Sequence, residues 1–516
     1  MMEKTVKKEH IRSDRNKEEQ KKPASLVRRV LLCVLACLCL FLAFPQLLPI
    51  RTAAEELMTA VDFPVRIDSG LQPPSDSPGL RYSESGEMLL GAYTNNRNNK
   101  MYLSLRDLAA LLNGTEGQFE FELEEEQDGY VLTKGAPYTG IEVVIDPEAE
   151  TLPGDHYDEL GNLWDSEDQL LYESPAGAVR PEYEYLDYMI NPLMIDGRET
   201  RFYSMQLSAT RDLYVDPVDA QLMLDITLEF ENGNVIRIDP SGFQIDLDAY
   251  EEDGYFDLFN GVVLGDATTG EILYGCKENN PDAIASTSKL MTYLVAAKYI
   301  MAGRISLDDK VILSENVGRL IDSGNGTLPM YTGQEVSLRD LISAMMLPSS
   351  NEAALAVAEY TAGSEEEFVR MMNETAGLLG LETARFYNAS GLPDYSDTLI
   401  ASARQNRMSA VDLFRLCTAL LGKYPEVIGF ASQKSMEAES FDYPLNNTNY
   451  LLYDMENCIG LKTGTTDEAG CCVAAAAKVP YADGEHILVA VVLGANSNLD
   501  RYQVPHLLFR WAETSR

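Results

Sequence analysis

Histidine is scarce in this sequence, which has four histidines in 516 residues. Two of them lie in the C-terminal half: His486 stands beside a predicted strand and His506 lies in the predicted last helix. No H-E-x-x-H string or comparable cluster of metal ligands occurs, which disfavours a zinc peptidase. A Ser-His-Asp hydrolase needs a histidine as its base, and neither histidine lies in a stretch that suggests a site. The sequence therefore predicts neither a metal site nor a cofactor.

Cysteine is also too irregularly placed to form a framework. Three of the eight cysteines, Cys33, Cys37 and Cys39, lie in one apolar run. The other five are an odd number and have no C-x-x-C spacing; they are Cys276, Cys417, Cys458, Cys471 and Cys472. This pattern favours small buried apolar residues over disulfides or metal ligands.

Positive charge is in the minority, because 41 Lys and Arg stand against 81 Asp and Glu, a net charge of -40. Residues 1–29 hold ten basic and five acidic residues, or +5, so residues 30–516 carry about -45 (-40 minus 5). A surface of this charge repels phosphate backbones. Nucleic acid is therefore not an expected partner.

The basic segment 1–29 leads into an uncharged apolar run, residues 30–50. Twenty-one residues at 1.5 Å each span about 30 Å, enough to cross a membrane as a helix. We expect an uncleaved transmembrane anchor in the cell membrane, with the basic segment inside and the bulk of the protein outside. Pro45 and Pro49 shorten the helix, so the alternative is a cleaved signal peptide, with Thr52–Ala54 as the processing site, and a secreted protein.

Residues 55–250 are acidic and rich in short alternating stretches, such as FEFELEEEQDGYVLTKG at 119–135, which predict a β-rich extracellular module. Residues 101–114, MYLSLRDLAALLNG, have helical spacing that ends at Gly114. This stretch weakly resembles the small domain at the N-terminus of copper amine oxidases, and residues 194–217 carry a fainter echo of it. The resemblance implies a binding or spacer module without copper chemistry, and an unclassified spacer is the alternative.

Residues 255–516 have a different pattern. Strands are predicted in GVVLGDATTGEILYG, GCCVAAAAKVP and HILVAVVLGA, with a closing helix in VPHLLFRWAETSR. Helices are predicted at 286–302, 337–347, 351–362, 366–379 and 408–421. Strands at both ends with helices between them predict one antiparallel sheet, assembled from distant parts of the chain and packed on a helical cluster.

Ser286 and Lys289 form an S-x-x-K pair at the start of a helix that is otherwise almost wholly apolar. Positions i and i+3 of a helix share a face, so the amine can reach the hydroxyl. A serine becomes a good nucleophile when a base removes its proton, and a lysine can act as that base once burial makes it neutral. S-x-x-K alone also arises by chance.

Lys462, Thr463 and Gly464 lead into a predicted strand. A lysine cation and a threonine hydroxyl suit a substrate carboxylate, and the glycine permits close approach of a ligand or neighbouring backbone. A second lysine near Lys289 would also favour its neutral form by repulsion between like charges. Taken alone, K-T-G is also compatible with an ordinary turn.

An S-x-N triplet occurs three times between these two motifs. Ser314–Asn316 and Ser323–Asn325 lie in polar loops, whereas Ser349 and Asn351 lie at the junction of two apolar predicted helices. Catalytic groups need rigid support, so we choose Ser349 and Asn351.

S-x-x-K, S-x-N and K-T-G in this order resemble the penicillin-recognising serine hydrolases. The strings ASTSKLMT, MMLPSSNEAALAVAE, ARFYNASGL, LNNTNYLLY and GLKTGTTDEAGCCVAAA narrow the resemblance to the low-molecular-mass D-alanyl-D-alanine carboxypeptidases, over nearly all of 255–516. Many members have Gly where Ser350 stands, and some have His where Thr465 stands; these departures leave the reaction type intact.

The resemblance implies an α/β (α+β) fold of the β-lactamase/DD-peptidase type, in which helices flank an antiparallel sheet. It implies that Ser286 attacks peptidoglycan stem peptides ending in D-Ala-D-Ala, that Lys289 accepts its proton, and that Ser349 relays a proton to the leaving D-alanine. Asn351, Lys462, Thr463, Gly464 and Thr465 would bind substrate, and β-lactams would inhibit.

Two rival functions remain. A class A β-lactamase needs a further Glu, commonly in E-x-x-L-N, and no such string lies between Asn351 and Lys462. A catalytically inert wall-binding or β-lactam-sensing protein is the other rival, and the intact Ser286 and Lys289 speak against it.

Overall fold

The computed structural model describes residues 56–515 except for 69–71, 76, 97–98, 125–128, 192, 207–211, 232–234, 395–403 and the stretch 141–188 outside four short strands. Residues 56–516 form one compact unit. The predicted membrane segment, 30–50, and the basic segment before it lie outside the described residues. In the part that is described, no helix is both long and apolar enough to span a membrane.

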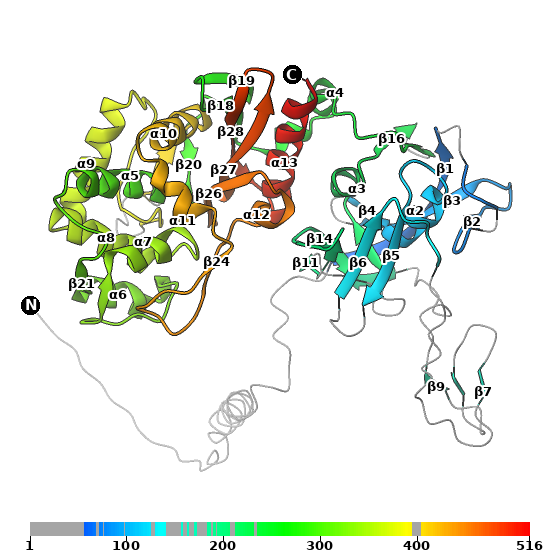
Figure 1. Cartoon of the computed structure of the whole chain (residues 1–516), viewed down its shortest axis with the longest axis horizontal. Helices are drawn as coiled ribbons and strands as arrows, with labels where there is room; N and C mark the ends of the chain where they lie inside the picture. Colours follow the sequence, from blue (N-terminus) through cyan, green and yellow to red (C-terminus); the bar gives the residue numbers. More distant parts are fainter. Residues whose placement is uncertain are drawn as a thin grey trace, which may run out of the picture. The chain divides into compact units, whose positions relative to one another are not determined.

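Strands dominate residues 56–239, as the alternating sequence pattern predicts (Figure 1). The largest sheet has the order β11-β14-β15-β4-β3-β1-β17-β16, with β10 beside β1 and β2 beside β3. Two smaller sheets have the orders β13-β12-β6-β5 and β7-β8-β9. The bounds are β1 Glu56–Ile67, β2 Arg81–Tyr82, β3 Met88–Asn95, β4 Met101–Ser104, β5 Phe119–Glu124, β6 Gly129–Lys134, β7 His156–Tyr157, β8 Leu163–Trp164, β9 Leu170–Tyr172, β10 Tyr183–Leu186, β11 Met189–Ile190, β12 Leu193–Ile195, β13 Arg198–Thr200, β14 Tyr203–Gln206, β15 Leu213–Val215, β16 Thr227–Glu231 and β17 Val235–Asp239.

Helix α2 (Leu105–Leu112) fills the core of this part, and α3 (Pro217–Leu224) packs near it. The helix predicted from residue 101 starts later, because Met101–Ser104 pair in a sheet as β4. The hydroxyl of Ser104 accepts a hydrogen bond from the backbone N–H of Asp107, which caps the helix at its true start. Gly114, with a φ of 75°, follows the helix end as the sequence predicted.

The segment after β17 contains α4 (Leu247–Glu252) and η2 (Tyr255–Leu258). Phe243, Leu247 and Phe256 from this segment are buried in one apolar cluster with the last helix, α13 (Asn498–Ser515). The predicted change of module at 250–255 therefore falls within a segment that packs against the C-terminal part of the chain.

The C-terminal part is organised around a five-stranded antiparallel sheet with the order β19-β18-β28-β27-β26. The bounds are β18 Gly261–Asp266, β19 Glu271–Cys276, β26 Cys458–Thr466, β27 Gly470–Tyr481 and β28 Gly484–Ala495. Strands from residues 261–276 and 458–495 thus share one sheet, which confirms the prediction that it is assembled from distant parts of the chain.

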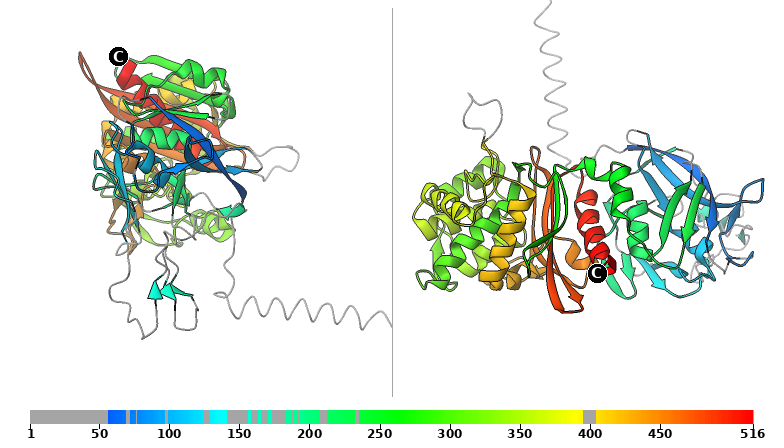
Figure 2. Two further views of the ribbon diagram at one scale, coloured as in Figure 1. Left: turned by 90° about the vertical axis from the view of Figure 1, so that its right-hand side faces the viewer. Right: turned by 90° about the horizontal axis from the view of Figure 1, so that it is seen from above.

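Side chains of this sheet alternate between two apolar cores. Val263 and Val491, which are paired in the register, face the helical cluster, whereas Val262 and Val492 face α13. Figure 2 shows the strands with the helical cluster on one face and α13 on the other. Burial on both faces explains why β27 and β28 read as nearly continuous apolar runs.

The remaining elements belong to the helical cluster, except for α12 (Leu451–Asp454), which packs in the apolar core beside α13. Their bounds are β20 Asp282–Ala283, η3 Ala285–Ser288, α5 Lys289–Met301, β21 Lys310–Ile312, α6 Glu315–Leu320, η4 Ile321–Asn325, β22 Glu335–Ser337, α7 Leu338–Met346, α8 Asn351–Ala362, α9 Glu365–Leu378, β23 Arg407–Met408, α10 Ala410–Lys423, η5 Pro425–Val427, α11 Ile428–Ala431, β24 Ser435–Met436, β25 Leu445–Asn446 and α12 Leu451–Asp454. Four of the five predicted helices agree to within two residues at each end. The fifth, 286–302, divides into the tight turn η3 and the α-helix α5.

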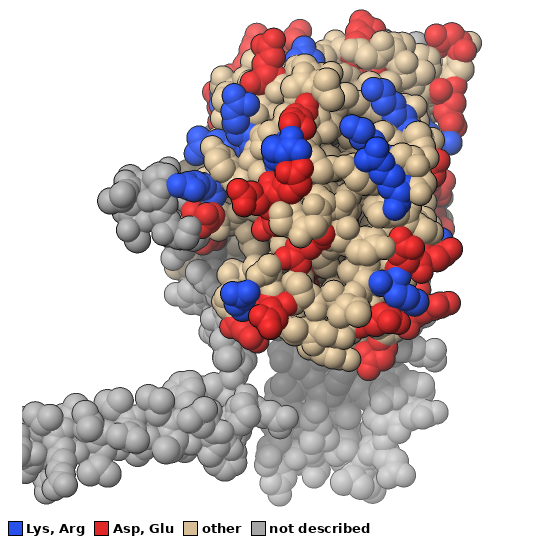
Figure 3. Space-filling model, turned by 90° about the vertical axis from the view of Figure 1, so that its left-hand side faces the viewer, with Lys and Arg blue, Asp and Glu red and all other residues tan. Residues whose placement is uncertain are grey.

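On the face of the helical cluster drawn in Figure 3, several basic side chains form a short row at the upper right, and elsewhere on this face basic and acidic side chains are interspersed.

Candidate active site

Ser286 lies in η3, and Lys289 is the first residue of α5, the central helix of the cluster. Nζ of Lys289 lies 2.7 Å from Oγ of Ser286, so the contact expected from the S-x-x-K spacing is present. The tight turn supplies this geometry, because residues three apart in a 3-10 turn are nearly eclipsed. Ala285, directly before the serine, has a φ of 43°, a conformation that non-glycine residues rarely adopt. The serine therefore stands on a sharp, strained bend.

Lys289 is completely buried, with an exposed fraction of 0%. Its amine is also 2.8 Å from Oδ1 of Asn351 and 2.8 Å from the carbonyl oxygen of Ser390. Burial lowers the pKa of Lys289 well below its ordinary value, and the positive charge of Lys462 lowers it further, while Glu352 raises it. The environment thus favours the neutral amine, which is the form that can accept a proton.

Asn351 begins α8 and comes from the S-x-N triplet chosen from the sequence. Its Nδ2 donates to the carbonyl of Asn325, 3.0 Å away, so its Oδ1 faces Lys289. The triplet at 314–316 lies elsewhere, because Ser314 and Asn316 both donate to the carboxylate of Glu359.

Ser349 has a φ of 66° and stands two residues before Asn351. It is half-buried, and its hydroxyl forms no hydrogen bond with the described residues. The neighbouring Ser350 instead caps α8 by accepting from the N–H of Ala353. The strained backbone and the capped helix hold the free hydroxyl of Ser349 at a rigid junction.

The K-T-G residues lie on the edge strand β26. Lys462 is buried, with an exposed fraction of 1%, and its Nζ donates to the carbonyl of Thr463 at 3.1 Å. Burial and the charge of Arg501 lower the pKa of Lys462 to about 7. The hydroxyl of Thr463 lies 2.6 Å from that of Thr448.

Gly464 is required for the contact between β26 and η3. A Cβ at this position would lie 2.6 Å from the backbone nitrogen of Ser286 and 2.9 Å from that of Thr287. Both are backbone atoms that cannot move aside without moving the nucleophile. The close approach expected from the glycine of K-T-G is therefore to the turn that carries Ser286.

Three parts of the site were missed by sequence reasoning. Arg501 of α13 donates to the carbonyl of Gly464 at 3.2 Å and to the hydroxyl of Thr465 at 2.8 Å, which fixes the strand after Lys462. The carbonyl of Ser390 contacts Lys289 from a loop 101 residues away in sequence. The carbonyl of Asn325 orients Asn351. Every residue has a backbone carbonyl, so the residue type does not reveal which carbonyl will join a site. Only the loop that carries Ser390 was marked in the sequence, by the string ARFYNASGL.

The two histidines of this part do not assemble a serine–histidine pair. Nδ1 of His486 is 2.6 Å from a carboxylate oxygen of the buried Asp266, but its Nε2 faces the carboxylate of Asp483 at 3.2 Å. The imidazole thus contacts two acids, and the Asp266–His486 pair links the neighbouring strands β18 and β28. These contacts give His486 no serine partner, in line with the expectation that a Ser-His-Asp hydrolase is disfavoured.

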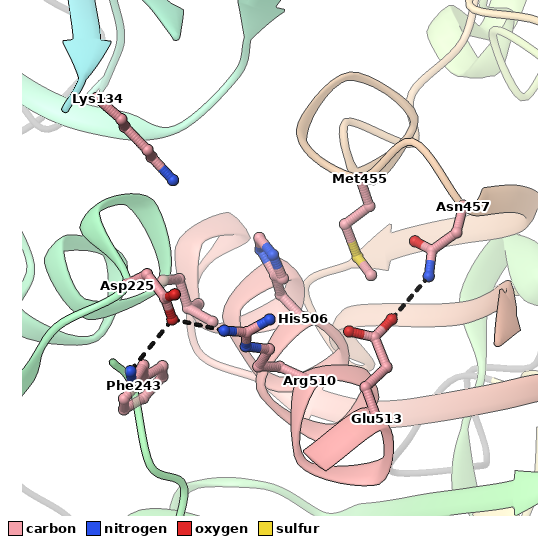
Figure 4. Close-up of a pocket in the computed structure, with 9 residues that line it drawn as sticks. Lys134, Asp225, Phe243, Met455, Asn457, His506, Arg510 and Glu513 are labelled. Atoms are coloured by element: carbon pink, nitrogen blue, oxygen red, sulfur yellow. Dashed lines mark hydrogen bonds and ion pairs between the residues drawn. The ribbon is translucent and has the colours of Figure 1, made fainter. Parts of the chain in front are cut away.

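His506 instead lines a cavity of about 210 Å³ away from the S-x-x-K pair (Figure 4). Burial and the charges of Arg510, Arg198 and Lys134 lower the pKa of His506 to about 4. Asp225 in this cavity accepts from Arg510, and Glu513 accepts from Asn457 at 2.9 Å. The described residues that line this cavity include no serine and no residue of the three motifs.

Comparison with known proteins agrees with the motifs. Residues 260–497 match a peptidase family described as D-alanyl-D-alanine carboxypeptidase. This part of the chain belongs to the D-alanyl-D-alanine carboxypeptidase family. The family match begins at residue 260, so the resemblance of 101–114 and 194–217 to the copper amine oxidase domain stays a prediction.

Two curated members of the carboxypeptidase family illustrate the similarity. D-alanyl-D-alanine carboxypeptidase DacD of Escherichia coli is 35% identical over 255 residues, which are 49% of this chain and 62% of the relative. DacF of Bacillus subtilis is 32% identical over 242 residues, 46% of this chain and 58% of the relative. The chain therefore spans about three fifths of the length of these relatives. Penicillin-binding protein D2 of Listeria monocytogenes, solved in its ampicillin-bound form, is 29% identical, with coverage of 49% of this chain and 96% of that chain and a TM-score of 0.41.

Replacing Lys462 by methionine is expected to stabilise the fold. With a pKa of about 7 in the folded protein and about 10.4 in the unfolded chain, Lys462 is charged in both states below pH 7, where its burial destabilises the folded state. Between pH 7 and 10.4 the folded state releases the proton first, so this destabilisation fades. The melting temperature of Lys462→Met should exceed that of the parent most clearly near pH 6. The expected rise is a few °C, which corresponds to a gain of about 1–3 kcal/mol in the free energy of unfolding.

Lys478→Met is the matched control, because Lys478 lies on the neighbouring strand β27 with a half-exposed side chain paired to Glu485. We expect its melting temperature to follow the parent's at every pH. An unchanged melting temperature of Lys462→Met at pH 6 would show that the buried amine carries no electrostatic cost.

Proposed function

We propose that this protein is a serine-type D-Ala-D-Ala carboxypeptidase that removes the terminal D-alanine from peptidoglycan stem peptides through an acyl-enzyme on Ser286. The observation that carries the proposal is the 2.7 Å contact between Oγ of Ser286 and the fully buried amine of Lys289. Membership of residues 260–497 in the D-alanyl-D-alanine carboxypeptidase family supports the substrate class.

The contacts of Lys289 favour a role as general base. A neutral amine has two N–H donors and one lone pair. Oδ1 of Asn351 and the carbonyl of Ser390 can only accept, so they engage the two N–H groups. The lone pair is left for the hydroxyl of Ser286, which then donates its proton to the amine as its oxygen attacks the peptide carbonyl.

The developing oxyanion would be held by the backbone N–H groups of Ser286 and Thr465, as the family resemblance implies. The contact between β26 and η3 at Gly464 supports this role, because it brings the two backbones against one another. The tetrahedral intermediate then collapses and the C–N bond breaks. D-Alanine leaves with a proton relayed through Ser349, and water releases the shortened peptide from Ser286 in the second step.

Lys462 and Thr463 would bind the terminal carboxylate of the substrate. The ammonium of Lys462 and the hydroxyl of Thr463 supply an ionic and a neutral hydrogen bond. A bound carboxylate also favours the charged form of Lys462. With a pKa of about 7 in the free protein, the amine is divided between its charged and neutral forms near neutral pH. Asn351 would contact the substrate backbone in addition to Lys289.

Release of D-alanine from diacetyl-Lys-D-Ala-D-Ala tests the proposal. We expect the purified protein to release one D-alanine per peptide and to form a long-lived adduct with benzylpenicillin. Rapid, repeated hydrolysis of penicillin would favour a β-lactamase instead. A stable adduct without D-alanine release would favour the β-lactam-sensing protein.

Gly464→Ala is expected to slow acylation of Ser286 by penicillin about 100-fold, because the added methyl group displaces the turn that carries the nucleophile. The overpacked contact should also lower the free energy of unfolding by about 1–3 kcal/mol. Stopped-flow acylation and denaturant unfolding measure the two effects. Gly422→Ala in α10 is the control, since nothing lies within 4 Å of its added methyl group; an equal loss in both variants would remove the special role of Gly464.

We also propose that the catalytic part works outside the cell membrane and that residues 30–50 tether it as a single-pass anchor. The uncharged run and the basic segment before it support this topology. N-terminal sequencing of the protein from a membrane fraction distinguishes the anchor from a cleaved signal peptide, which would leave a new N-terminus near Thr52–Ala54.

A further inference from the structure

Glu352 is a buried carboxylate directly behind the proposed site. It is the second residue of α8, next to Asn351, and its exposed fraction is 0%. No Lys or Arg of the described residues forms an ion pair with it. Burying a carboxylate without a cation is costly unless hydrogen bonds replace its water, so the residue needs a structural explanation.

Backbone N–H groups provide those hydrogen bonds. The carboxylate accepts from the N–H of Thr327 at 2.9 and 3.1 Å and from the N–H of Leu328 at 2.5 Å. Thr327 and Leu328 follow η4 in the loop 321–328. Glu352 therefore fastens this loop to the start of α8.

The fastened loop fixes the orientation of Asn351. The carbonyl of Asn325, two residues before Thr327, accepts from Nδ2 of Asn351 at 3.0 Å. This bond determines which end of the amide faces Lys289, because Oδ1 then lies 2.8 Å from its Nζ. The Ser323–Asn325 triplet, which the choice of S-x-N set aside, thus contributes a backbone carbonyl to the site.

The orientation decides what the lone pair of Lys289 can do. With Oδ1 toward the amine, Asn351 only accepts, and the lone pair stays available to the hydroxyl of Ser286. A flipped amide would present Nδ2, a donor, which would compete with that hydroxyl for the lone pair. An untethered loop would remove the carbonyl that prevents the flip.

We propose that Glu352 is a positioning residue that, through loop 321–328 and the carbonyl of Asn325, holds the amide of Asn351 with its oxygen toward Lys289. This proposal rests on the proposed function, because Glu352 would act on Lys289, the proton acceptor of that reaction. Glu352 itself contacts neither Ser286 nor Lys289 by a hydrogen bond among the described residues.

Glu352→Gln tests this role with little change of volume, because it replaces the charged acceptor by a neutral carbonyl oxygen and places an NH₂ donor beside the backbone N–H that the second carboxylate oxygen accepts. We expect the second-order rate constant for penicillin acylation of Ser286 to fall about 10- to 100-fold. Glu352→Asp keeps the carboxylate on a shorter stem and should recover part of the rate. Asp340→Asn is the control. Asp340 is also buried near the start of a helix, and it accepts hydrogen bonds from the backbone N–H and the hydroxyl of Ser440, which lies in a loop that contacts neither Glu352 nor Asn351 by a hydrogen bond among the described residues.

A double-mutant cycle separates positioning from general destabilisation. In an Asn351→Ala background the amide is absent, so Glu352→Gln should cause no further loss of rate. Full additivity of the two losses would overturn the proposal, and so would a loss in Asp340→Asn as large as that in Glu352→Gln. Parent protein that forms no adduct on Ser286 would instead overturn the proposed function, so the two failures are distinguishable.

Discussion

Replacing Ser286 by alanine is expected to abolish both penicillin labelling and D-alanine release, a loss of about 10⁴- to 10⁶-fold. The variant retains Lys289, Lys462 and the rest of the site but has no oxygen that can form the acyl bond. The fold should survive, because the change removes one hydrogen bond of a partly exposed serine, worth about 1 kcal/mol.

Intact-protein mass spectrometry after incubation with benzylpenicillin measures this effect directly. The parent should gain the mass of one penicillin, and peptide mapping should place it on Ser286. Ser306→Ala is the matched control, since Ser306 is exposed, lies outside the site, and its hydroxyl accepts from the backbone N–H of Asp308.

Penicillin labelling of Ser286→Ala would contradict this prediction. If Ser286→Ala still gains one penicillin at the parent's rate, the nucleophile is elsewhere, and the roles proposed for Lys289 and K-T-G fail with it. Labelling of Ser288 is not expected, because its buried hydroxyl donates to the carbonyl of Ala285 at 2.7 Å.

The sequence predicted the parts of this site that depend on residue type and local spacing. The S-x-x-K contact follows from three-residue periodicity. K-T-G was expected to lead into a strand; the structure places it within β26, which the sequence did not predict, and the predicted strand that follows is β27. The sheet was predictable because apolar strands flank the helical region. In the N-terminal part the strands were predictable as a class, but their order, with β1 between β3 and β17, was not, since it depends on pairings between distant segments.

The remaining parts of the site depend on contacts that leave no local pattern. Lys289 meets the carbonyl of Ser390, and Asn351 meets that of Asn325. Any residue can supply a backbone carbonyl, so its place is fixed by the fold and not by a side chain. Arg501 was missed for a related reason: an arginine in the last helix looks like a solvated residue until the helix packs beside β26.

Lys289→Arg and Lys289→Met are expected to slow acylation of Ser286 by about 10²- to 10⁴-fold, and by similar factors. Methionine has no basic group. Arginine keeps the positive charge but does not lose its proton at any working pH, so it cannot accept the proton of Ser286. Comparing the two variants therefore separates proton acceptance from simple electrostatic attraction.

The pH dependence sharpens this comparison. Burial and Lys462 lower the pKa of Lys289 well below its ordinary value, so the parent's acylation rate should fall as acid protonates Lys289, because the ammonium has no lone pair. That acid limb should be absent from the residual activity of both variants. Lys298→Arg, on the exposed face of the same helix, should keep the parent's rate and pH profile.

A rate for Lys289→Arg near that of the parent would mean that the site needs a cation and that Ser286 loses its proton to another group. The contacts around the amine argue against that result. A guanidinium has only donors, and it would need acceptors on every side, whereas the hydroxyl of Ser286 must itself donate for its oxygen to become nucleophilic. The amine of Lys289 is fully buried between two acceptors, Asn351 and Ser390, and the hydroxyl of Ser286. These surroundings fit a neutral amine that takes up one proton during attack and can return it when D-alanine leaves.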